Sequence, residues 1–338
     1  MKAHDALLLF FWVSLLSIGR SVYAEPSLEG VSSFAYQLQT IDTASLAASP
    51  YDLLIVDYSS DGTQRGAFTR DQIRALTAAG KTVLAYMSIG EAERYRFYFK
   101  SSWVRRASRG VCRTTPSTRA PSWLDAANPH YCDNYKVRYW HRSWRRTIYG
   151  IKSGRKKSYL DRILDAGYSG VYLDLIDAYE YWVDQPGKQR RRSAARDMAQ
   201  LVIDLAHYAR EKRGESDFVV VPQNGAEIIL RISGAQRAQY LKTIQGIGAE
   251  DTFFFGGRDE DNRFAPQPVI EVLDRYIAAD KKVFALDYLL AASKVDHFAR
   301  VACARGYIPQ VSNRALDTLT NHALVGCMCV AAIHGSVC

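Results

Sequence analysis

Residues 170–182 read GVYLDLIDAYEYW, an apolar run that ends in three carboxylates within seven residues. Its first half, residues 171–174, has the continuous apolar character expected of a parallel strand buried on both faces. The acids that follow are Asp174, Asp177 and Glu180, and aromatic residues lie between them. The stretch therefore predicts a core strand whose carboxyl end opens onto a polar site.

Seven further apolar runs resemble this one along the chain. With residues 171–174, the predicted strands are 34–38, 53–57, 82–88, 218–222, 243–247, 282–287 and 307–311. Segments with helical spacing of apolar residues separate several of them, at 69–79, 159–166, 193–210 and 269–279. Eight strands alternating with helices predict an α/β protein with a (β/α)₈ TIM barrel in a single domain.

The connection that follows the third predicted strand, residues 91–150, is too long for a plain barrel loop. Barrels place substrate-binding insertions at this end of their strands, so we expect its aromatic residues near the substrate: Trp103, Trp123, Trp140, Trp144, Tyr131, Tyr135 and Tyr139. Cys112 and Cys132 lie twenty residues apart within it and are predicted to form a disulfide. The pairing of Cys303, Cys327, Cys329 and Cys338 stays open.

The amino-terminal segment combines Lys2, an apolar run and small residues up to Ala24, which is typical of a secretory signal peptide spanning residues 1–24. A membrane anchor is the alternative, but the run is shorter than the ~20 residues that a span needs. We expect a barrel domain over 25–320, a cysteine-containing tail over 321–338, and an exported or periplasmic protein without stable membrane insertion after cleavage. Six cysteines fit an oxidising compartment.

The formal net charge is +9 for the whole chain, and much of the excess comes from local runs such as residues 188–192. Such runs are usually solvated faces, and no nucleic-acid module accompanies them. We therefore expect no nucleic-acid partner and a monomeric protein. A Cys-x-Cys pair at 327–329 has no second pair at metal-ligand spacing, so no metal site is predicted.

Carboxylates recur at the carboxyl ends of the predicted strands, where barrel enzymes keep their chemistry. A single acid at such a position can simply cap the next helix. Acids from different strands, with aromatic residues nearby, instead provide the two carboxyl groups that glycosidic bond cleavage needs. The acids at or just after strand ends are Asp57, Glu91, Glu93, Asp174, Asp177, Glu250, Asp251 and Asp287.

Motifs spread over residues 33–315 resemble glycoside hydrolase family 114, the endo-α-1,4-polygalactosaminidases. The specific ones are LDLIDAYEYW at 173–182 and GIGAED at 246–251. Weaker ones accompany them in order: YQLQ (36–39), LLIVDYS (53–59), VLAYMSIGEAE (83–93), VRYW (137–140), PQNGAE (222–227) and LDYL (286–289). The resemblance implies a (β/α)₈ barrel that hydrolyses α-1,4-linked galactosamine or N-acetylgalactosamine polymers without a metal or organic cofactor.

Carried over by motif, the resemblance implies Asp174 and Glu250 as the catalytic pair, at the ends of the fourth and sixth strands. By analogy with α-retaining barrels, Asp174 is the nucleophile and Glu250 the general acid/base. Candidates to orient sugar hydroxyls, or to pair with the ammonium groups of a deacetylated polymer, are Asp57, Tyr58, Tyr86, Glu91, Asp177, Asn224, Asp287 and Tyr288.

Two alternatives remain at the level of the sequence. The chain could be a barrel glycosidase that acts on another α-linked polysaccharide. It could also be an inactive secreted barrel that binds carbohydrate, in which case its acids would only hold structure or orient ligand. Activity on galactosaminans, and its loss on substitution of Asp174 or Glu250, would distinguish a galactosaminan hydrolase from both alternatives.

Overall fold

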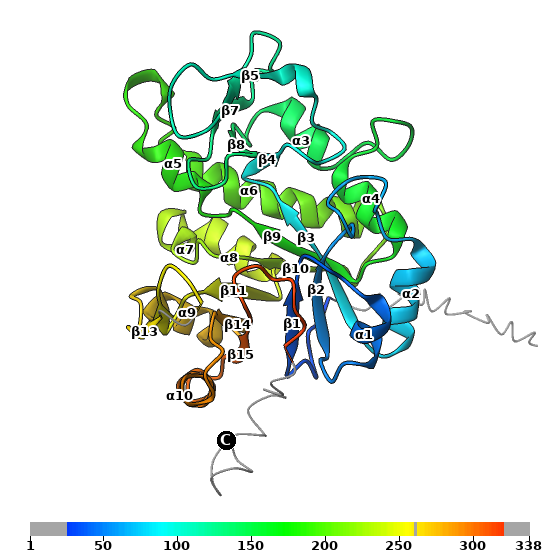
Figure 1. The fold of residues 1–338 in the computed structure, drawn as a ribbon, viewed down its shortest axis with the longest axis vertical. Coiled ribbons are helices and arrows are strands. Elements are labelled where there is room, and N and C mark those ends of the chain that lie inside the picture. Colours follow the sequence, from blue (N-terminus) through cyan, green and yellow to red (C-terminus); the bar gives the residue numbers. More distant parts are fainter. Residues whose placement is uncertain (1–25, 260–261, 321–338) are drawn as a thin grey trace, which may run out of the picture.

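The computed structural model describes residues 26–259 and 262–320, and its centre is a set of parallel strands surrounded by helices (Figure 1). The predicted signal peptide and cysteine tail lie outside the described residues. The eight parallel strands found among the described residues are β1 (Phe34–Gln37), β2 (Leu53–Asp57), β3 (Thr82–Ser88), β9 (Gly170–Asp174), β10 (Val219–Pro222), β11 (Gly246–Glu250), β14 (Lys282–Asp287) and β15 (Ile308–Val311).

These strands follow one another around the centre in chain order. A five-stranded ladder, β1-β2-β3-β9-β10, continues into a three-stranded ladder, β11-β14-β15. A parallel bridge between Gln223 and Gly248 joins the two. On the other side β15 contacts β1, and just beyond them the N–H groups of Leu38 and Gln39 donate to the carbonyl oxygen of Leu316. The predicted (β/α)₈ TIM-barrel class is confirmed.

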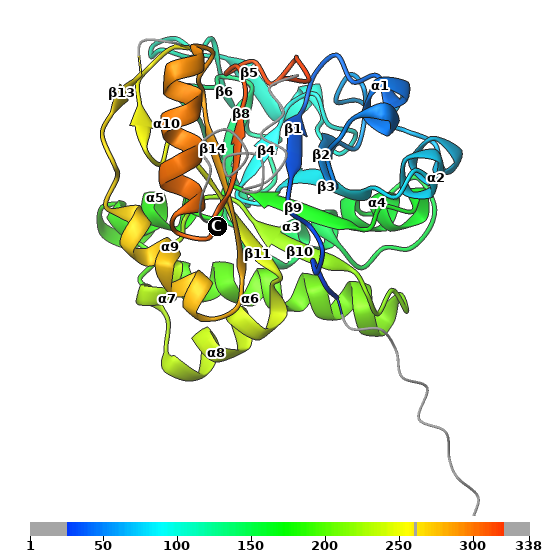
Figure 2. The same ribbon diagram turned by 90° about the horizontal axis from the view of Figure 1, so that it is seen from below.

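The helices cover the outside of the strands (Figure 2). They are α1 (Thr43–Ala48), α2 (Arg70–Ala78), α3 (Arg142–Ile148), α4 (Tyr159–Ala166), α5 (Ala178–Asp184), α6 (Ala194–His207), α7 (Ile228–Arg231), α8 (Gly234–Thr243), α9 (Val269–Ala278) and α10 (Ala292–Cys303). The predicted helix starts and stops are those of the structure to within a residue for α2, α4 and α9. Thr69 forms the capping box of α2 with Gln72, and Gly167 ends α4 in the left-handed conformation.

Alternating residues of each strand face the barrel interior and the helices. The interior is filled by side chains that come from strands all around the barrel, among them Phe34, Ile55, Tyr172 and Phe284. The intervening residues pack against the helices in a second, larger core. Burial on both sides explains why most of these strands read as continuous apolar runs.

Strand β11 is the one whose predicted position was wrong, by three residues. The prediction placed it at 243–247, whereas it spans Gly246–Glu250 and Thr243 ends α8. Both of its interior positions, Gly246 and Gly248, lack a side chain, so the apolar pattern was centred too early. A Cβ on Gly248 would lie 1.7 Å from the hydroxyl of Tyr172, which shows that the glycine makes room for that ring.

The predicted insertion forms a separate layer beyond β3. Its strands β4 (Glu91–Glu93), β8 (Asn134–Val137) and β7 (Leu124–Ala127) form one antiparallel sheet, and β5 (Val104–Arg106) and β6 (Thr114–Pro116) form a hairpin. The predicted disulfide between Cys112 and Cys132 is present. Figure 1 shows β5, β7 and β8 together at the end of the molecule that carries α3 and α5.

The tryptophans of the insertion serve mainly as its core and not as a sugar platform. Trp123 packs against Trp103 and Trp144, with ring centroids 5.2 and 4.8 Å apart. The buried Trp144 donates its indole N–H to the carbonyl oxygen of Ile89. The expectation that these residues lie near the substrate is therefore wrong for most of them, because a small β-layer needs its own apolar interior.

Candidate active site

The alternation of strand residues decides which polar side chains enter the barrel mouth. Ile55, Tyr172 and Tyr36 face the interior, and two residues further along a strand the side chain points the same way. Asp57 and Asp174 therefore enter the mouth. Glu250 follows the interior positions Gly246 and Gly248 and enters it by the same rule.

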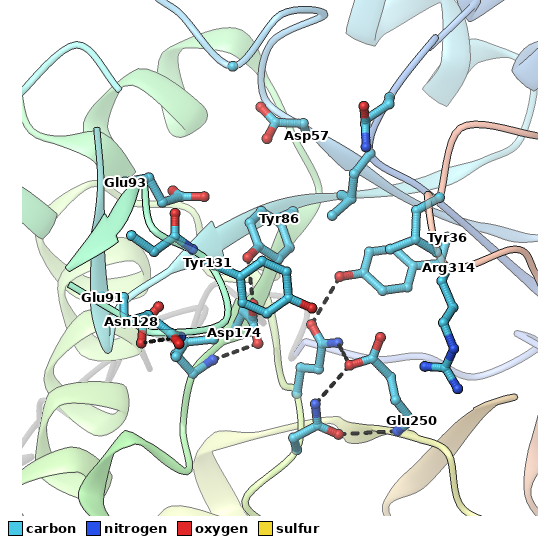
Figure 3. A pocket seen from close by; sticks show the side chains of 18 of the residues that line it. Tyr36, Asp57, Tyr86, Glu91, Glu93, Asn128, Tyr131, Asp174, Glu250 and Arg314 are labelled. Carbon is cyan, nitrogen blue, oxygen red and sulfur yellow. Dashed lines mark hydrogen bonds between the residues drawn. The ribbon is translucent and has the colours of Figure 1, made fainter. Parts of the chain in front are cut away.

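A pocket of about 930 Å³ occupies this mouth, between the strand ends and the insertion (Figure 3). The barrel contributes Tyr36, Asp57, Tyr86, Asp174, Gln223, Asn224, Glu250 and Tyr288. The insertion and the loops contribute Gln39, Asp61, Glu91, Glu93, Tyr95, Asn128, Tyr131, Asn134, Lys136, Asp177, Glu180, Tyr181 and Arg314, among others.

Glu250 is held by three hydrogen-bond donors. Its Oε2 accepts from the side-chain amides of Gln223, at 2.6 Å, and Asn224, at 2.9 Å. Its Oε1 accepts from the hydroxyl of Tyr288. The oxygen of the Gln223 amide in turn accepts from Tyr36. This network fixes the orientation of the carboxyl group toward the pocket.

Asp174 is held by two hydrogen-bond donors. Its Oδ2 accepts from the hydroxyl of Tyr86 at 2.5 Å, and its Oδ1 accepts from the backbone N–H of Leu175 at 2.7 Å. Burial and the negative charge of Glu250 raise the pKa of Asp174 well above its ordinary value. The negative charge of Glu250 therefore disfavours the ionised form of Asp174, so the protonation of Asp174 depends on its partner.

The backbone turns sharply after three consecutive strands at this site. Leu175, Asn224 and Asp251 have φ values of 64°, 58° and 50°, each one residue beyond a pocket-lining side chain. Asparagine and aspartate tolerate this left-handed region, but at Leu175 it costs about 1–3 kcal/mol, so the surrounding structure must hold that residue in place. Such strain clusters at functional sites, where it sets the direction of the preceding side chain.

Acidic groups dominate the pocket wall contributed by the insertion and α5. Glu91 receives Lys136 at 2.5 Å and the amide of Asn128 at 3.0 Å, both on Oε1. Its Oε2 is buried and has no hydrogen-bond partner among the described residues. Restricted solvent access and the nearby Glu180 carboxylate raise the pKa of Asp177 to about 6. This wall presents acceptor oxygens to whatever enters the pocket.

A buried arginine joins the barrel to the insertion at the other side of the pocket. Arg96 donates to both carboxylate oxygens of Asp57, at 2.8 and 2.6 Å, and to both of Glu93, at 2.6 and 3.1 Å. Its side chain is fully buried. Burial alone would lower the pKa of Arg96, but Glu93, Tyr159 and Asp57 reverse this and raise it. Arg96 thus fixes two pocket-lining carboxylates while remaining charged.

Eight of the ten predicted site residues line the pocket: Asp57, Tyr86, Glu91, Asp174, Asp177, Asn224, Glu250 and Tyr288. Tyr58 and Asp287 do not. Tyr58 follows the inward-facing Asp57, so it points outward and packs edge-on against Tyr159. Asp287 precedes the inward-facing Tyr288 and accepts backbone N–H groups from residues 252–254. The alternation of strand residues places both in structural positions.

Several lining residues were not among the predicted site residues. Gln223 directly follows the predicted strand 218–222, and Tyr36 is an inward-facing polar residue within the predicted strand 34–38, so both carry a signal in the sequence. Asn128 and Lys136 carry no such signal, since they reach the pocket only through the folding of the insertion, whereas Tyr131 is one of the insertion's aromatic residues expected near the substrate and lines the pocket. Arg314, from the loop after β15, pairs with Asp251 at 2.7 Å.

Within residues 26–259 and 262–320, no group of three or more His, Cys, Asp or Glu side chains is arranged to hold a metal ion. None of the helices in these ranges is long and apolar enough to cross a membrane.

Comparison with known families bears directly on this site. The model of glycoside-hydrolase family GH114 matches residues 19–330 of the chain. The chain belongs to family GH114. This confirms the predicted resemblance and makes the protein a glycoside hydrolase, with the paired carboxyl groups of the barrel mouth as its candidate active site.

Relatives of this GH114 chain include proteins of unknown activity. Uncharacterized protein MJ1477 of Methanocaldococcus jannaschii is 33% identical over 295 residues, which cover 85% of this chain and 77% of that protein. An uncharacterized protein of Thermotoga maritima is also 33% identical, over 292 residues, covering 85% of this chain and 81% of its own length.

Solved structures share the fold of this GH114 chain. The glycoside hydrolase domain of PelA from Pseudomonas aeruginosa matches with a TM-score of 0.55 and 22% identity, covering 85% of this chain and 97% of that domain. Aspergillus fumigatus Ega3, determined in complex with galactosamine, matches with a TM-score of 0.54 and 16% identity, covering 87% and 95%. These similarities support the barrel architecture.

Proposed function

We propose that this GH114 enzyme hydrolyses α-1,4-linked galactosamine or N-acetylgalactosamine polysaccharide, with Asp174 and Glu250 as its catalytic carboxyl groups. The observation that carries the proposal is that both groups enter one pocket from strands separated only by β10. Neighbouring strands lie about 4.8 Å apart, so the two backbones are roughly 10 Å apart and the inward-pointing side chains span the space between them. A glycosidic bond fits between such a pair.

The proposed reaction is a double displacement with retention. Asp174 attacks the anomeric carbon while Glu250 gives its proton to the departing glycosidic oxygen, forming a glycosyl ester on Asp174. Glu250 then takes a proton from water, whose oxygen attacks the anomeric carbon and releases Asp174. Tyr86 donates to the Asp174 carboxyl group, and Tyr288, Gln223 and Asn224 hold that of Glu250.

The charge of the pocket supports a cationic, deacetylated polymer as the preferred substrate. Of the carboxyl groups that line it, Asp61, Asp174, Asp177, Glu180 and Glu250 have no ion-pair partner within the described parts of the chain. A bound ammonium group would stabilise ionised carboxylates around it. It would therefore lower the pKa of Asp174 and favour the ionised nucleophile. The galactosamine bound in the Ega3 structure is of the same chemical class.

Digestion of defined polymers tests the activity and the pair together. The enzyme is incubated with polygalactosamine, its N-acetylated form and an α-glucan, and products are sized while their anomeric form is followed by NMR. We expect cleavage of galactosaminan with initial release of the α-anomer. Asp174→Asn and Glu250→Gln should each lower kcat by at least about a thousandfold, because each carboxyl group has a separate role in both steps.

Asp280→Asn is the matched control for these amide substitutions. Asp280 is exposed, precedes β14 at the opposite end of the barrel, and has a φ of 59° that asparagine also tolerates. Its variant should retain full activity. Cleavage of the α-glucan alone would overturn the substrate assignment, and binding of galactosaminan without any hydrolysis would support a carbohydrate-binding barrel. Initial release of the β-anomer would replace retention by inversion.

Glu91→Gln tests the role of charge in substrate preference. The change keeps the size of a buried side chain that lines the pocket and removes its negative charge. We expect KM for the deacetylated polymer to rise, with a smaller change for the acetylated polymer, because only the former carries ammonium groups. An equal change for both polymers would contradict recognition of the ammonium group by this wall.

We also propose that the protein acts outside the cytoplasm. The disulfide between Cys112 and Cys132 fits an oxidising compartment. Amino-terminal sequencing of the exported protein should begin at Glu25, immediately after the predicted cleavage site. A mature protein that retains Met1 would contradict signal-peptide cleavage.

A further inference from the structure

One segment of the insertion has a charge pattern that the pocket does not use. No aspartate or glutamate occurs between Glu93 and Asp125, whereas this stretch holds eight lysines and arginines. Two of the eight have carboxylate partners, since Arg96 is buried against Asp57 and Glu93, and Arg94 pairs with Asp133. Soluble proteins usually mix both signs on their surfaces, so an uninterrupted basic stretch of this length indicates a charged face.

We call residues 104–119 the arginine hairpin. Strands β5 and β6 pair in antiparallel register, and the N–H of Ala107 donates to the carbonyl oxygen of Arg113 at 2.8 Å, which extends the ladder toward the tip. Five arginines of the hairpin are exposed and have no carboxylate partner among the residues that the structure describes: Arg105, Arg106, Arg109, Arg113 and Arg119.

The tip of the hairpin combines these charges with an exposed apolar side chain. Val111 is 78% exposed and lies between Gly110 and Cys112. The disulfide to Cys132 ties the tip to the segment next to Tyr131, which lines the pocket. The tip therefore presents an apolar side chain to solvent on a loop that is covalently fixed to the enzyme's substrate side.

The chemistry of the hairpin favours one kind of partner. Residues 104–119 contain no aromatic residue, and the preceding Trp103 packs inward against Phe99 and Trp123. Sugars and single-stranded bases are held largely by stacking on aromatic faces, which this surface does not offer. Clustered basic residues beside an exposed apolar side chain, at the tip of a hairpin, instead suit the headgroup region of an anionic bilayer.

We propose that the arginine hairpin docks the enzyme on a membrane surface rich in anionic phospholipids, with Val111 at the headgroup boundary. Arginine guanidinium groups bind phosphate oxygens in a bidentate manner, which suits phospholipid headgroups. Because the disulfide connects the hairpin to the pocket rim, docking places the active site beside the membrane surface. This proposal is independent of which polysaccharide the enzyme cleaves.

Vesicle co-sedimentation tests the docking. The full protein is mixed with phosphatidylcholine vesicles that contain either no phosphatidylglycerol or 30% of it, at 50 and 300 mM NaCl. We expect binding only to the anionic vesicles, and weaker binding at the higher salt because surface charges are screened. The double variant Arg105→Gln with Arg109→Gln should bind about 25-fold more weakly, since each arginine near such a surface contributes roughly fivefold.

The matched control removes two exposed charges elsewhere. Arg190→Gln with Arg192→Gln lowers the net charge equally, outside the hairpin, and should leave binding nearly unchanged. Val111→Ser should weaken binding at both salt concentrations, because its contribution is apolar. All variants should keep the thermal midpoint and the activity of the parent protein on soluble substrate, since none of these residues lines the pocket.

Two outcomes would overturn the proposal. Equal loss of vesicle binding in the hairpin and control variants would show that net charge alone is responsible. Failure to bind anionic vesicles, together with hairpin-dependent binding to heparin or to a short DNA duplex in parallel assays, would assign the surface to a soluble polyanion instead of a membrane.

Discussion

Replacement of the buried Arg96 by methionine should strongly destabilise the fold. The Arg96 side chain is fully buried, and its partners Asp57 and Glu93 are only 8% and 1% exposed. Methionine fills part of the same space but leaves two buried carboxylates without a counter-charge. Breaking a buried ion pair in this way costs about 3–5 kcal/mol. For a domain of this size, that corresponds to a fall in Tm of roughly 6–20 °C.

Arg94→Met provides a control two residues away. Arg94 pairs with Asp133 at 3.2 Å, but their side chains are 43% and 66% exposed, so the loss should stay below about 1 kcal/mol. Urea unfolding followed by circular dichroism measures both variants, with the slope of the transition checked for two-state behaviour. Adding Asp57→Asn and Glu93→Gln to Arg96→Met removes the unpaired charges and should restore at least half of the lost stability.

The sign of the pH dependence gives a second check on the same reasoning. Burial raises the pKa of Asp57 even beside Arg96, and loss of that counter-charge raises it further, so the Asp57 carboxyl group holds its proton in the folded state at a pH where the unfolded chain has released it. The penalty therefore grows as the pH rises above about 4, and Arg96→Met should be closest to the parent protein at low pH. If Arg96→Met costs no more than Arg94→Met at pH 7, the reasoning is refuted.

Three further changes have defined outcomes. Asp174→Asn should raise Tm at pH 7, because the pKa of Asp174 is raised in the folded protein and its carboxyl group destabilises the fold as the pH rises above the unfolded pKa of 3.8. The gain in Tm should vanish near pH 3.5. A lower Tm of the variant at pH 7 would contradict this. Gly248→Ala should cost about 1–3 kcal/mol in urea unfolding, since its Cβ would lie 1.7 Å from the Tyr172 hydroxyl, and Tyr172→Phe should recover part of that loss. Cys112→Ser with Cys132→Ser should make the insertion more sensitive to trypsin, because the disulfide closes a loop of about twenty residues and stabilises the folded loop by about 3 kcal/mol. Unchanged cleavage rates would show that packing alone holds the loop.

The barrel itself was largely predictable from local pattern. Continuous apolar runs identify seven of the eight barrel strands with small errors at their ends, because strands covered on both faces need apolar side chains throughout. Strand β11 was misplaced because its interior positions are Gly246 and Gly248, which leave no apolar signal.

Part of the site could also be predicted from the sequence. Asp57, Asp174 and Glu250 are inward-facing residues at strand ends, and the alternation of side chains that points them into the mouth also points Tyr58 and Asp287 away from it. The positions of these two residues outside the pocket could have been predicted by counting along the strands. Local periodicity therefore determines the direction of these side chains.

Only the tertiary structure decided what surrounds them. The carboxylates of Asp57 and Glu93 are fixed by Arg96, and Asn128 and Lys136 reach Glu91 because β4 pairs with β8 more than forty residues along the chain. The tryptophans of the insertion, expected near the substrate, instead lie in or against the core of that layer. Contacts of this kind depend on which surfaces meet when the chain folds, and no periodicity within a segment encodes its distant partner. The sequence by itself thus determined the barrel and its acidic mouth, whereas the folded insertion decided the shape and charge of the pocket.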